Sequence, residues 1–139
     1  MVPYTKGEIK AIAYKNGKVV AEESYATAEG EKNIKVSPSK NILSTEDKEN
    51  TLVFIDVVDD KGSLFPLAAD YISVEVSGAG KLRGLDNGDP LDLTPYTSNS
   101  KRAFRGKLVA FIEAEGKGSI EVKVYLKDQL VEELKLESK

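Results

Sequence analysis

The segment "GLDNGDP", residues 84–90, brings together the side chains best suited to chemistry in this 139-residue chain. Asp86, Asn87 and Asp89 surround a single glycine there. Carboxylate and amide oxygens at this spacing suit three roles: holding a calcium ion, acting as an acid–base pair on a sugar, or turning the chain. The chain contains no histidine or cysteine, which excludes imidazole bases, thiolate nucleophiles and zinc–sulfur sites.

The ligand spacing argues against calcium. A calcium-binding EF-hand loop needs oxygen ligands at positions 1, 3 and 5 and a glutamate at position 12. Counted from Asp86, the later positions hold Gly88, Pro90 and Thr97, none of which carries a carboxylate. The segment suits a turn instead, because Asn87–Gly88 supplies a positive-φ pair and Pro90 keeps the residue before it extended. We therefore predict a structural turn whose acids accept backbone N–H groups, and no metal or cofactor site.

The remaining acids do not form a recognisable glycosidase pair. Such pairs lie about 5–10 Å apart in a cleft that raises the pKa of one carboxyl group. Here Glu75 and Glu121 alternate with apolar residues on outward strand faces, and Asp59 and Asp60 lie in a predicted turn. Acids in such places are normally solvated, so we predict no catalytic residue in this chain.

A long loop, "PLDLTPYTSNSKR" at residues 90–102, is the other candidate site. Its prolines exclude a central strand, and long loops on rigid scaffolds often carry contacts. Lys101, Arg102 and Arg105 form a basic cluster beside Phe104, which suits docking against an acidic neighbour. The alternative is that Phe104 closes the end of the core and the three cations are solvated. The candidate residues for an interdomain or ligand contact are Asp86, Asn87, Asp89, Tyr96, Arg102 and Phe104.

Sugar binding is another use that this surface could have. Carbohydrate-binding modules stack aromatic rings on the apolar C–H face of a pyranose, and this chain has six tyrosines but no tryptophan. Tyr71 and Tyr125 fall on outward faces of predicted strands, and Tyr96 falls in the long loop. Exposed tyrosines on strands also serve as cross-strand packing residues. An exposed, coplanar tyrosine pair would favour an oligosaccharide ligand.

Alternation of apolar and polar residues dominates the chain, as in "YISVEVSG" (71–78) and "SIEVKVYL" (119–126). Glycine-rich turns separate these runs, and the pattern is typical of half-buried antiparallel strands in an all-β sandwich. The segment "QLVEELKLES" (129–138) also fits a helical face, but the turn residues before it favour a last strand. The expected core comprises Ile34, Val36, Val53, Ile55, Val57, Ile72, Val74, Val76, Leu82, Val109, Phe111, Ile120, Val122 and Val124.

Residues 1–28 have a different organisation. Asn16–Gly17 separates two strand-like runs, and this dipeptide is a strong signal for a type I′ hairpin. The polar segment "TAEGEKN" (27–33) that follows is typical of a linker. An isolated hairpin buries too little apolar surface to offset its ordering entropy. We therefore predict that this hairpin is the end of a preceding domain, and that it either docks on an edge of the sandwich or is mobile.

Composition limits the partners. A net charge of −3 gives no reason to expect nucleic acid, which needs a clustered positive patch. No run of about 18 apolar residues is present, so no membrane span is expected. Lys6, Glu8, Lys10 and Lys15 interrupt the first residues, which are therefore not expected to be a signal peptide. We therefore expect that the protein is either cytosolic or has an N-terminal targeting signal outside this sequence.

Several segments together resemble a known family. "VPYTKGEIKAIAYKNGKVVAEESYATA" is similar to the closing strands of the small β domain near the C-terminus of bacterial β-galactosidases of glycoside hydrolase family 2. "LVFIDVVDDKGSLFPLAADYISVEVSGAGKLRGLDNGDP" and "KRAFRGKLVAFIEAEGKGSIEVKV" resemble the immunoglobulin-like domain that follows it. That domain is in turn similar to the bacterial immunoglobulin-like modules of intimin and invasin adhesins.

The resemblance implies an immunoglobulin-like β-sandwich of seven to eight strands at 29–139, after a β-hairpin left from a neighbouring domain at 1–28. It also implies that the catalytic glutamates lie on a separate TIM barrel, which takes about 200 residues or more and cannot fit in this chain. We therefore expect a non-catalytic accessory domain that spaces or braces other domains of a parent β-galactosidase-like enzyme. The resemblance suggests a periplasmic or secreted bacterial protein. The alternatives are a carbohydrate-binding module and a cell-surface adhesion module.

Overall fold

The computed structural model describes residues 5–139, so the first four residues of the predicted 1–28 segment lie outside the described residues. The regular elements are β1 (Glu8–Lys15), β2 (Lys18–Ala26), β3 (Asn33–Pro38), β4 (Ile42–Leu43), β5 (Asn50–Val58), β6 (Tyr71–Gly78), β7 (Gly80–Asp86), β8 (Ser100–Arg102), β9 (Lys107–Ala114), β10 (Gly118–Leu126) and β11 (Gln129–Ser138). Residues 5–139 include no helix that is long and apolar enough to span a bilayer.

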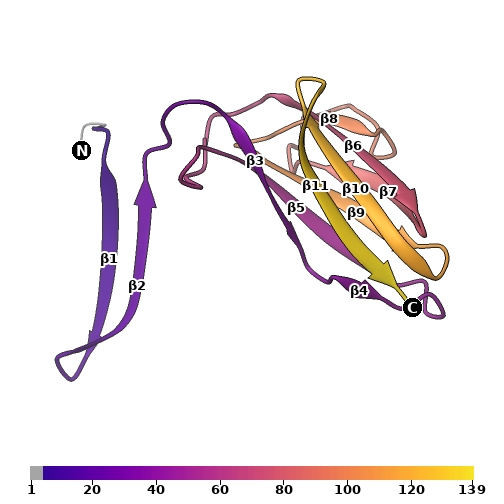
Figure 1. Ribbon diagram of the computed structural model, residues 1–139. Helices are drawn as coiled ribbons and strands as arrows, with labels where there is room; N and C mark the ends of the chain where they lie inside the picture. Colours follow the sequence, from indigo (N-terminus) through magenta and orange to yellow (C-terminus); the bar gives the residue numbers. More distant parts are fainter. Residues whose placement is uncertain (1–4) are drawn as a thin grey trace.

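Strands β3 to β11 form a two-layer sandwich (Figure 1). One layer has the order β3-β5-β9-β7 and the other has the order β4-β11-β10-β6-β8. The pairings are antiparallel except for the short parallel contact of β4 with β11. The predicted immunoglobulin-like β-sandwich is confirmed. It has nine strands rather than seven to eight, because two-residue β4 and three-residue β8 are too short for alternation to reveal.

The core lies between the two layers and consists of the inward residues of each strand. Val53 and Ile55 of β5 are fully buried, as are Ile120 and Val124 of β10 in the opposite layer. Each side chain buried in this way stabilises the fold by about 1.5–3 kcal/mol relative to leaving it in water. Three more of the expected core residues pack against this cluster while only partly buried: Val36, Val76 and Leu82.

The expected orientation of β9 is wrong. Leu108, Ala110 and Ile112 face the core, whereas Val109 and Phe111 lie on the outer face, where Phe111 is 36% exposed. The segment "KLVAFIEA" is apolar on both faces, so alternation alone cannot select the inward set. Pairing with β5 and β7 selects it, because a one-residue change of register would turn every side chain to the other face. The outer face of this sheet therefore carries apolar and aromatic side chains.

The C-terminal segment forms strand β11, as predicted. It pairs with β10 through a two-residue turn in which Lys127 has φ 51 and Asp128 has φ 64. Two positive φ values at these positions match the twist of the flanking strands. The strand alternation then buries Leu136 against the core.

Strands β1 and β2 form the predicted hairpin, with φ 52 at Asn16 and φ 73 at Gly17. The hairpin forms a two-stranded sheet of its own and pairs with neither layer of the sandwich. Figure 1 shows it standing away from the sandwich. Every side chain of β1 and β2 is exposed, including Ile9 at 78% and Tyr25 at 71%. Of the two predicted states, docking on a sandwich edge is therefore not seen in this structure, and mobility of the hairpin stays a prediction.

The linker after the hairpin is tied to the sandwich at two points. The backbone N–H of Glu29 donates to the Asp59 carboxylate at 3.1 Å. Lys32 Nζ lies 2.6 Å from Asp70 Oδ2, and Lys127 Nζ lies 3.2 Å from the other oxygen. Burial would raise the pKa of Asp70, but the hydrogen bonds from Lys32 and Lys127 outweigh it and hold that pKa below its ordinary value. These contacts set the direction in which the chain enters the sandwich.

Candidate docking surface on the β7–β8 loop

The loop between β7 and β8 is built from a series of Asx turns. In each turn a side-chain oxygen accepts the backbone N–H two residues ahead, which holds the chain in a tight bend. The four hydrogen bonds are Gly88 N–H to Asp86 at 2.9 Å, Asp89 N–H to Asn87 at 3.0 Å, Leu91 N–H to Asp89 at 3.0 Å and Thr94 N–H to Asp92 at 2.8 Å. The predicted structural turn is confirmed, although only Gly88 of the expected pair has a positive φ, of 73.

A buried ion pair holds this loop against the sandwich. Lys101 Nζ lies 3.0 Å from Asp92 Oδ2 and 2.8 Å from the carbonyl oxygen of Thr94, and its side chain is only 2% exposed. Asn87 Nδ2 donates to Asp92 Oδ2 at 2.7 Å and to the carbonyl oxygen of Arg102 at 3.0 Å. These hydrogen bonds link the start of the loop, at Asn87, to its middle at Asp92 and to strand β8.

The electrostatics of the loop keep Asp92 ionised. Hydrogen bonds from the backbone and side chain of Thr94, then from Lys101, hold the pKa of Asp92 well below its ordinary value. Lys101 Nζ also lies 5.2 Å from the centroid of the Tyr96 ring, which adds a cation–π contact to the ion pair. The pair is a structural anchor. Among residues 5–139 no group of three or more acidic side chains is arranged to hold a metal ion.

The loop is also clamped to the neighbouring strand β7. The backbone N–H of Leu85 donates to the carbonyl oxygen of Tyr96 at 2.7 Å. A Cβ atom on Gly84 would lie 2.6 Å from that same oxygen, a distance at which the backbone would have to move. Glycine at 84 therefore allows the loop to approach β7 this closely.

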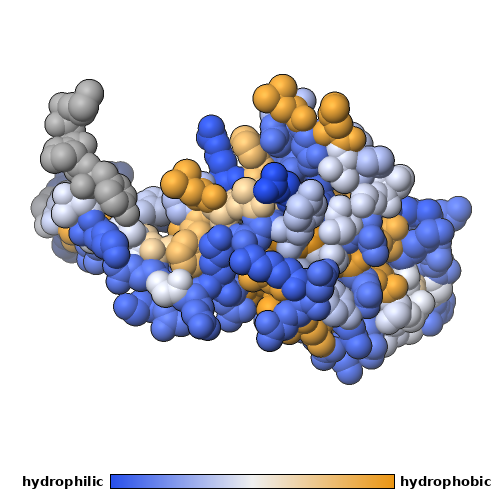
Figure 2. All heavy atoms as spheres, turned by 90° about the horizontal axis from the view of Figure 1, so that it is seen from above, coloured by the Kyte–Doolittle hydropathy of each residue, from blue (hydrophilic) through white to orange (hydrophobic). Residues whose placement is uncertain are grey.

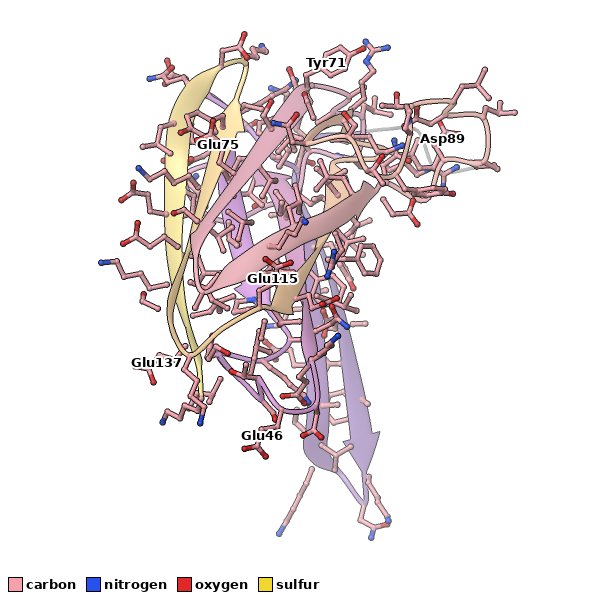
Figure 3. The ribbon with its side chains drawn as sticks, turned by 90° about the vertical axis from the view of Figure 1, so that its right-hand side faces the viewer. Glu46, Tyr71, Glu75, Asp89, Glu115 and Glu137 are labelled. Carbon is pink, nitrogen blue, oxygen red and sulfur yellow. The ribbon has the colours of Figure 1, made fainter. Side chains whose placement is uncertain are left out.

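This fixed loop presents apolar side chains to solvent. Leu91 is 84% exposed, Leu93 is 95% exposed and Tyr96 is 67% exposed. Figure 3 shows the loop, marked by Asp89, projecting beyond the end of the sheet. Figure 2 shows apolar residues standing out from a largely polar surface. Leucine side chains held in water on a loop anchored by hydrogen bonds make this a candidate docking surface. We call Leu91, Leu93 and Tyr96 the loop surface.

The expected basic cluster does not form, because its three cations are separated. Lys101 is buried in the ion pair with Asp92. The Arg102 guanidinium lies 5.4 Å from the centroid of the Tyr71 ring and donates to the carbonyl oxygen of Ala69 at 3.2 Å. Arg105 lies over the half-buried ring of Phe104 at 5.4 Å. A lysine in a polar loop gives no sequence signal of burial, and its partner lies nine residues earlier with no periodic relation to it.

The tyrosines considered as an alternative sugar platform are engaged with polar neighbours. Arg102 covers one face of the Tyr71 ring, and Figure 3 shows Tyr71 near one end of the sheet. The Tyr125 hydroxyl donates to Glu75 Oε2 at 2.8 Å, and the hydrogen bond to this carboxylate raises the pKa of Tyr125. Tyr96 lies apart in the loop, beside Lys101. This arrangement gives no support to a coplanar tyrosine pair.

Comparison with known proteins matches this architecture to one family. The model of glycoside hydrolase family 2 C-terminal domain 5 matches residues 34–134. β-Galactosidase BoGH2A of Bacteroides ovatus is 35% identical over 116 residues, which are 84% of this chain and 14% of that protein. A putative β-glucuronidase of Formosa agariphila is 32% identical over 115 residues, which are 82% of this chain and 11% of that protein.

A solved structure extends the match beyond the sandwich. The crystal structure of a β-glycosidase from Bacteroides vulgatus superposes with a TM-score of 0.90 at 34% identity. The match covers 98% of this chain, so it includes most of the hairpin, but only 18% of that protein. This chain spans a small part of the length of the enzymes that it matches. The chain belongs to the glycoside hydrolase family 2 C-terminal domain 5 family.

Proposed function

We propose that this chain is a non-catalytic accessory domain of a β-galactosidase-like enzyme, and that its loop surface braces a neighbouring domain of that enzyme. The observation that carries the proposal is the contrast within one loop. Asp92 is held against Lys101 of β8 by a buried ion pair, while Leu91 and Leu93 are held almost fully in water. Burying each leucine against a partner would contribute about 1.5–3 kcal/mol. A loop that is already rigid loses little further entropy on docking.

Family membership supports the accessory role. The relatives carry two different activity names, β-galactosidase and β-glucuronidase, for proteins that share this domain. A domain shared across both activities is better suited to supporting the enzyme than to choosing its substrate. In this proposal the chemistry takes place on other domains, and β-galactosides are the substrate class.

The proposal also divides the chain into two parts. Residues 1–28 would be the closing hairpin of a preceding β domain, and residues 29–139 would be the accessory domain itself. Support comes from Ile9 and Tyr25, which are exposed although they pair across the strands. Neither outer edge of the hairpin pairs with another strand among the described residues, so each edge has backbone groups to which a further strand could bind. A preceding sheet would cover these groups and side chains.

The test is a chimera of the Bacteroides ovatus β-galactosidase in which this chain replaces the matching C-terminal segment. We expect the chimera to retain β-galactosidase activity and thermal stability. The Leu91→Ser/Leu93→Ser chimera should unfold at a lower temperature, because two anchors are lost from the interface. Ile42→Ser is the matched control, since Ile42 is 54% exposed on β4, at the opposite edge of its sheet from β8.

Equal melting temperatures for the chimera and the double variant would contradict the brace. The isolated 139-residue chain should not hydrolyse 4-nitrophenyl β-galactoside. Hydrolysis above the buffer rate that scales with protein concentration would contradict the non-catalytic role.

A further inference from the structure

The outer face of the four-stranded layer carries a groove whose lining includes none of the three loop-surface residues. Its lining includes Ser37 on β3, Phe54 on β5, Val109 on β9 and Asp86 at the end of β7. The strand register explains why they meet. Ser37 pairs with Phe54, Phe54 with Val109, and Val109 with Asp86. The four residues therefore form one row across the whole layer, about 14 Å from end to end at the usual strand spacing.

A second row borders the first at one side. Asp56 and Lys107 lie opposite each other on β5 and β9, and Lys107 Nζ lies 3.0 Å from Asp56 Oδ1. Both residues line the groove. Each is two residues from a member of the first row, so both rows lie on the same face of the sheet.

The groove combines an apolar floor with polar flanks. Phe54 is 46% exposed at its centre, beside half-buried Val109. Asp86 Oδ1 accepts the backbone N–H of Gly88, which leaves the second carboxylate oxygen as an acceptor. Asp56 uses one oxygen for Lys107 and likewise has a second. A few polar groups around an apolar and aromatic floor are typical of small-molecule sites.

We propose that this groove binds a neutral hexopyranose ring. The ring would place its C–H groups on Phe54 and Val109, because aliphatic C–H groups suit the negative face of an aromatic ring. Its hydroxyl groups would donate to Asp86 and Asp56 and accept from Lys107. The site is distinct from the loop surface, so it adds a binding function to the brace.

The charge of the groove selects against acidic sugars. Asp56 and Lys107 compensate each other, and Asp86 has no cationic partner within 4 Å among the described residues. The lining therefore carries one excess negative charge, which repels a uronate carboxylate. Hydroxyl groups meet no such penalty and can satisfy the free carboxylate oxygens as donors.

The test is an amide chemical-shift titration of the isotope-labelled 139-residue chain. Methyl β-galactopyranoside and methyl β-glucopyranoside are the neutral probes, and methyl β-glucuronide is the charged probe. We expect saturable shifts at residues 35–37, 54–56, 86–88 and 107–109 with the neutral probes. Binding of the glucuronide should be weaker by about fivefold, the effect of one like charge at a solvent-exposed site.

Two variants sharpen the assignment. Phe54→Leu keeps the apolar volume but removes the aromatic face, and should weaken binding by about tenfold. Asp86→Asn can still accept the Gly88 N–H, and should reduce the preference for neutral sugars. Tyr71→Leu is the control, because Tyr71 is 56% exposed on the other layer, and it should leave binding unchanged.

Three results would overturn the proposal. The first is no saturable shift with either neutral probe. The second is shifts centred on Tyr71 or Tyr96 instead of Phe54. The third is groove shifts that grow with protein concentration in the absence of sugar, which would assign the groove to a second copy of the chain.

Discussion

The hairpin and the sandwich are built from the same kind of strand, yet only one of them has a core. The β1–β2 ladder is continuous apart from one bulge, as are the ladders of β5 and β10. In β5, however, Val53, Ile55 and Val57 are fully buried, whereas every side chain of the hairpin is exposed. Backbone hydrogen bonds add little net stability because they replace bonds to water. Burial of apolar surface therefore separates the two regions.

The difference in apolar burial distinguishes a region with its own core from one whose apolar side chains remain in water. The sandwich buries the inward apolar faces of its two layers against each other. The hairpin has apolar groups such as Ile9, Val20 and Tyr25 in water, which another sheet could cover. The two regions are joined by a linker that is fixed by Asp59 and Asp70. These contacts set the direction in which the hairpin leaves the sandwich.

A matched pair of isoleucine substitutions, one in the core and one in the hairpin, should give the largest difference in stability between the two regions. Ile55→Ala removes a fully buried side chain from the core, and should lower the free energy of unfolding by about 2–5 kcal/mol. Ile9→Ala removes the same atoms from the hairpin and should change it by less than about 0.5 kcal/mol. Urea unfolding followed by circular dichroism measures both. Similar losses for the two variants would mean that the hairpin is packed in solution.

The buried lysine that anchors the β7–β8 loop, Lys101 on β8, should give the next largest effect on stability. Lys101→Met leaves the Asp92 carboxylate without its cation and the Thr94 carbonyl without its donor, and should cost about 1–3 kcal/mol of stability. Lys107→Met is the control, because Lys107 forms a similar pair with Asp56 but its side chain is 60% exposed. It should cost less than about 0.5 kcal/mol. Equal costs would show that the loop is no better anchored than the open sheet surface.

The same ion pair should make stability depend on pH. Hydrogen bonds from Thr94 and Lys101 lower the pKa of Asp92 in the folded state, so the unfolded chain takes up this proton first. The stabilisation is therefore complete at neutral pH and is lost as the pH falls below about 4. Asp92→Asn should reduce the difference between urea midpoints at about pH 6 and about pH 3. An unchanged difference would contradict the assigned role of Asp92.

The loop leucines should have the smallest effect on the isolated chain. Leu91→Ser and Leu93→Ser alter side chains that are 84% and 95% exposed, so each should change the free energy of unfolding by less than about 0.5 kcal/mol. Thermal unfolding of the single variants measures this. A loss comparable with that of Lys101→Met would mean that these leucines pack within the domain, which would leave them unavailable as a brace.

The sequence was sufficient for the sandwich, the hairpin and the turn at residues 86–90, since alternation and glycine positions are local signals. It was not sufficient for Lys101, because burial of a lysine depends on Asp92 folding back over it. Nor was the sequence sufficient to orient β9, because both faces of this strand are apolar. Alternation therefore predicts a core position for Phe111, which lies on the outer face. The groove around Phe54 depends on that orientation and on the order of four strands. Such features arise from tertiary pairing, which no local pattern contains.

Residue-resolved amide hydrogen exchange on the 139-residue chain tests the contrast between the two regions most directly. Strands β5, β9 and β10 should exchange slowly, because exposing their amides requires the core to open. The hairpin amides of β1 and β2 should exchange fast, including those that are hydrogen-bonded across the ladder. Protection of the hairpin equal to that of β5 would contradict this account, since no strand of the sandwich covers it.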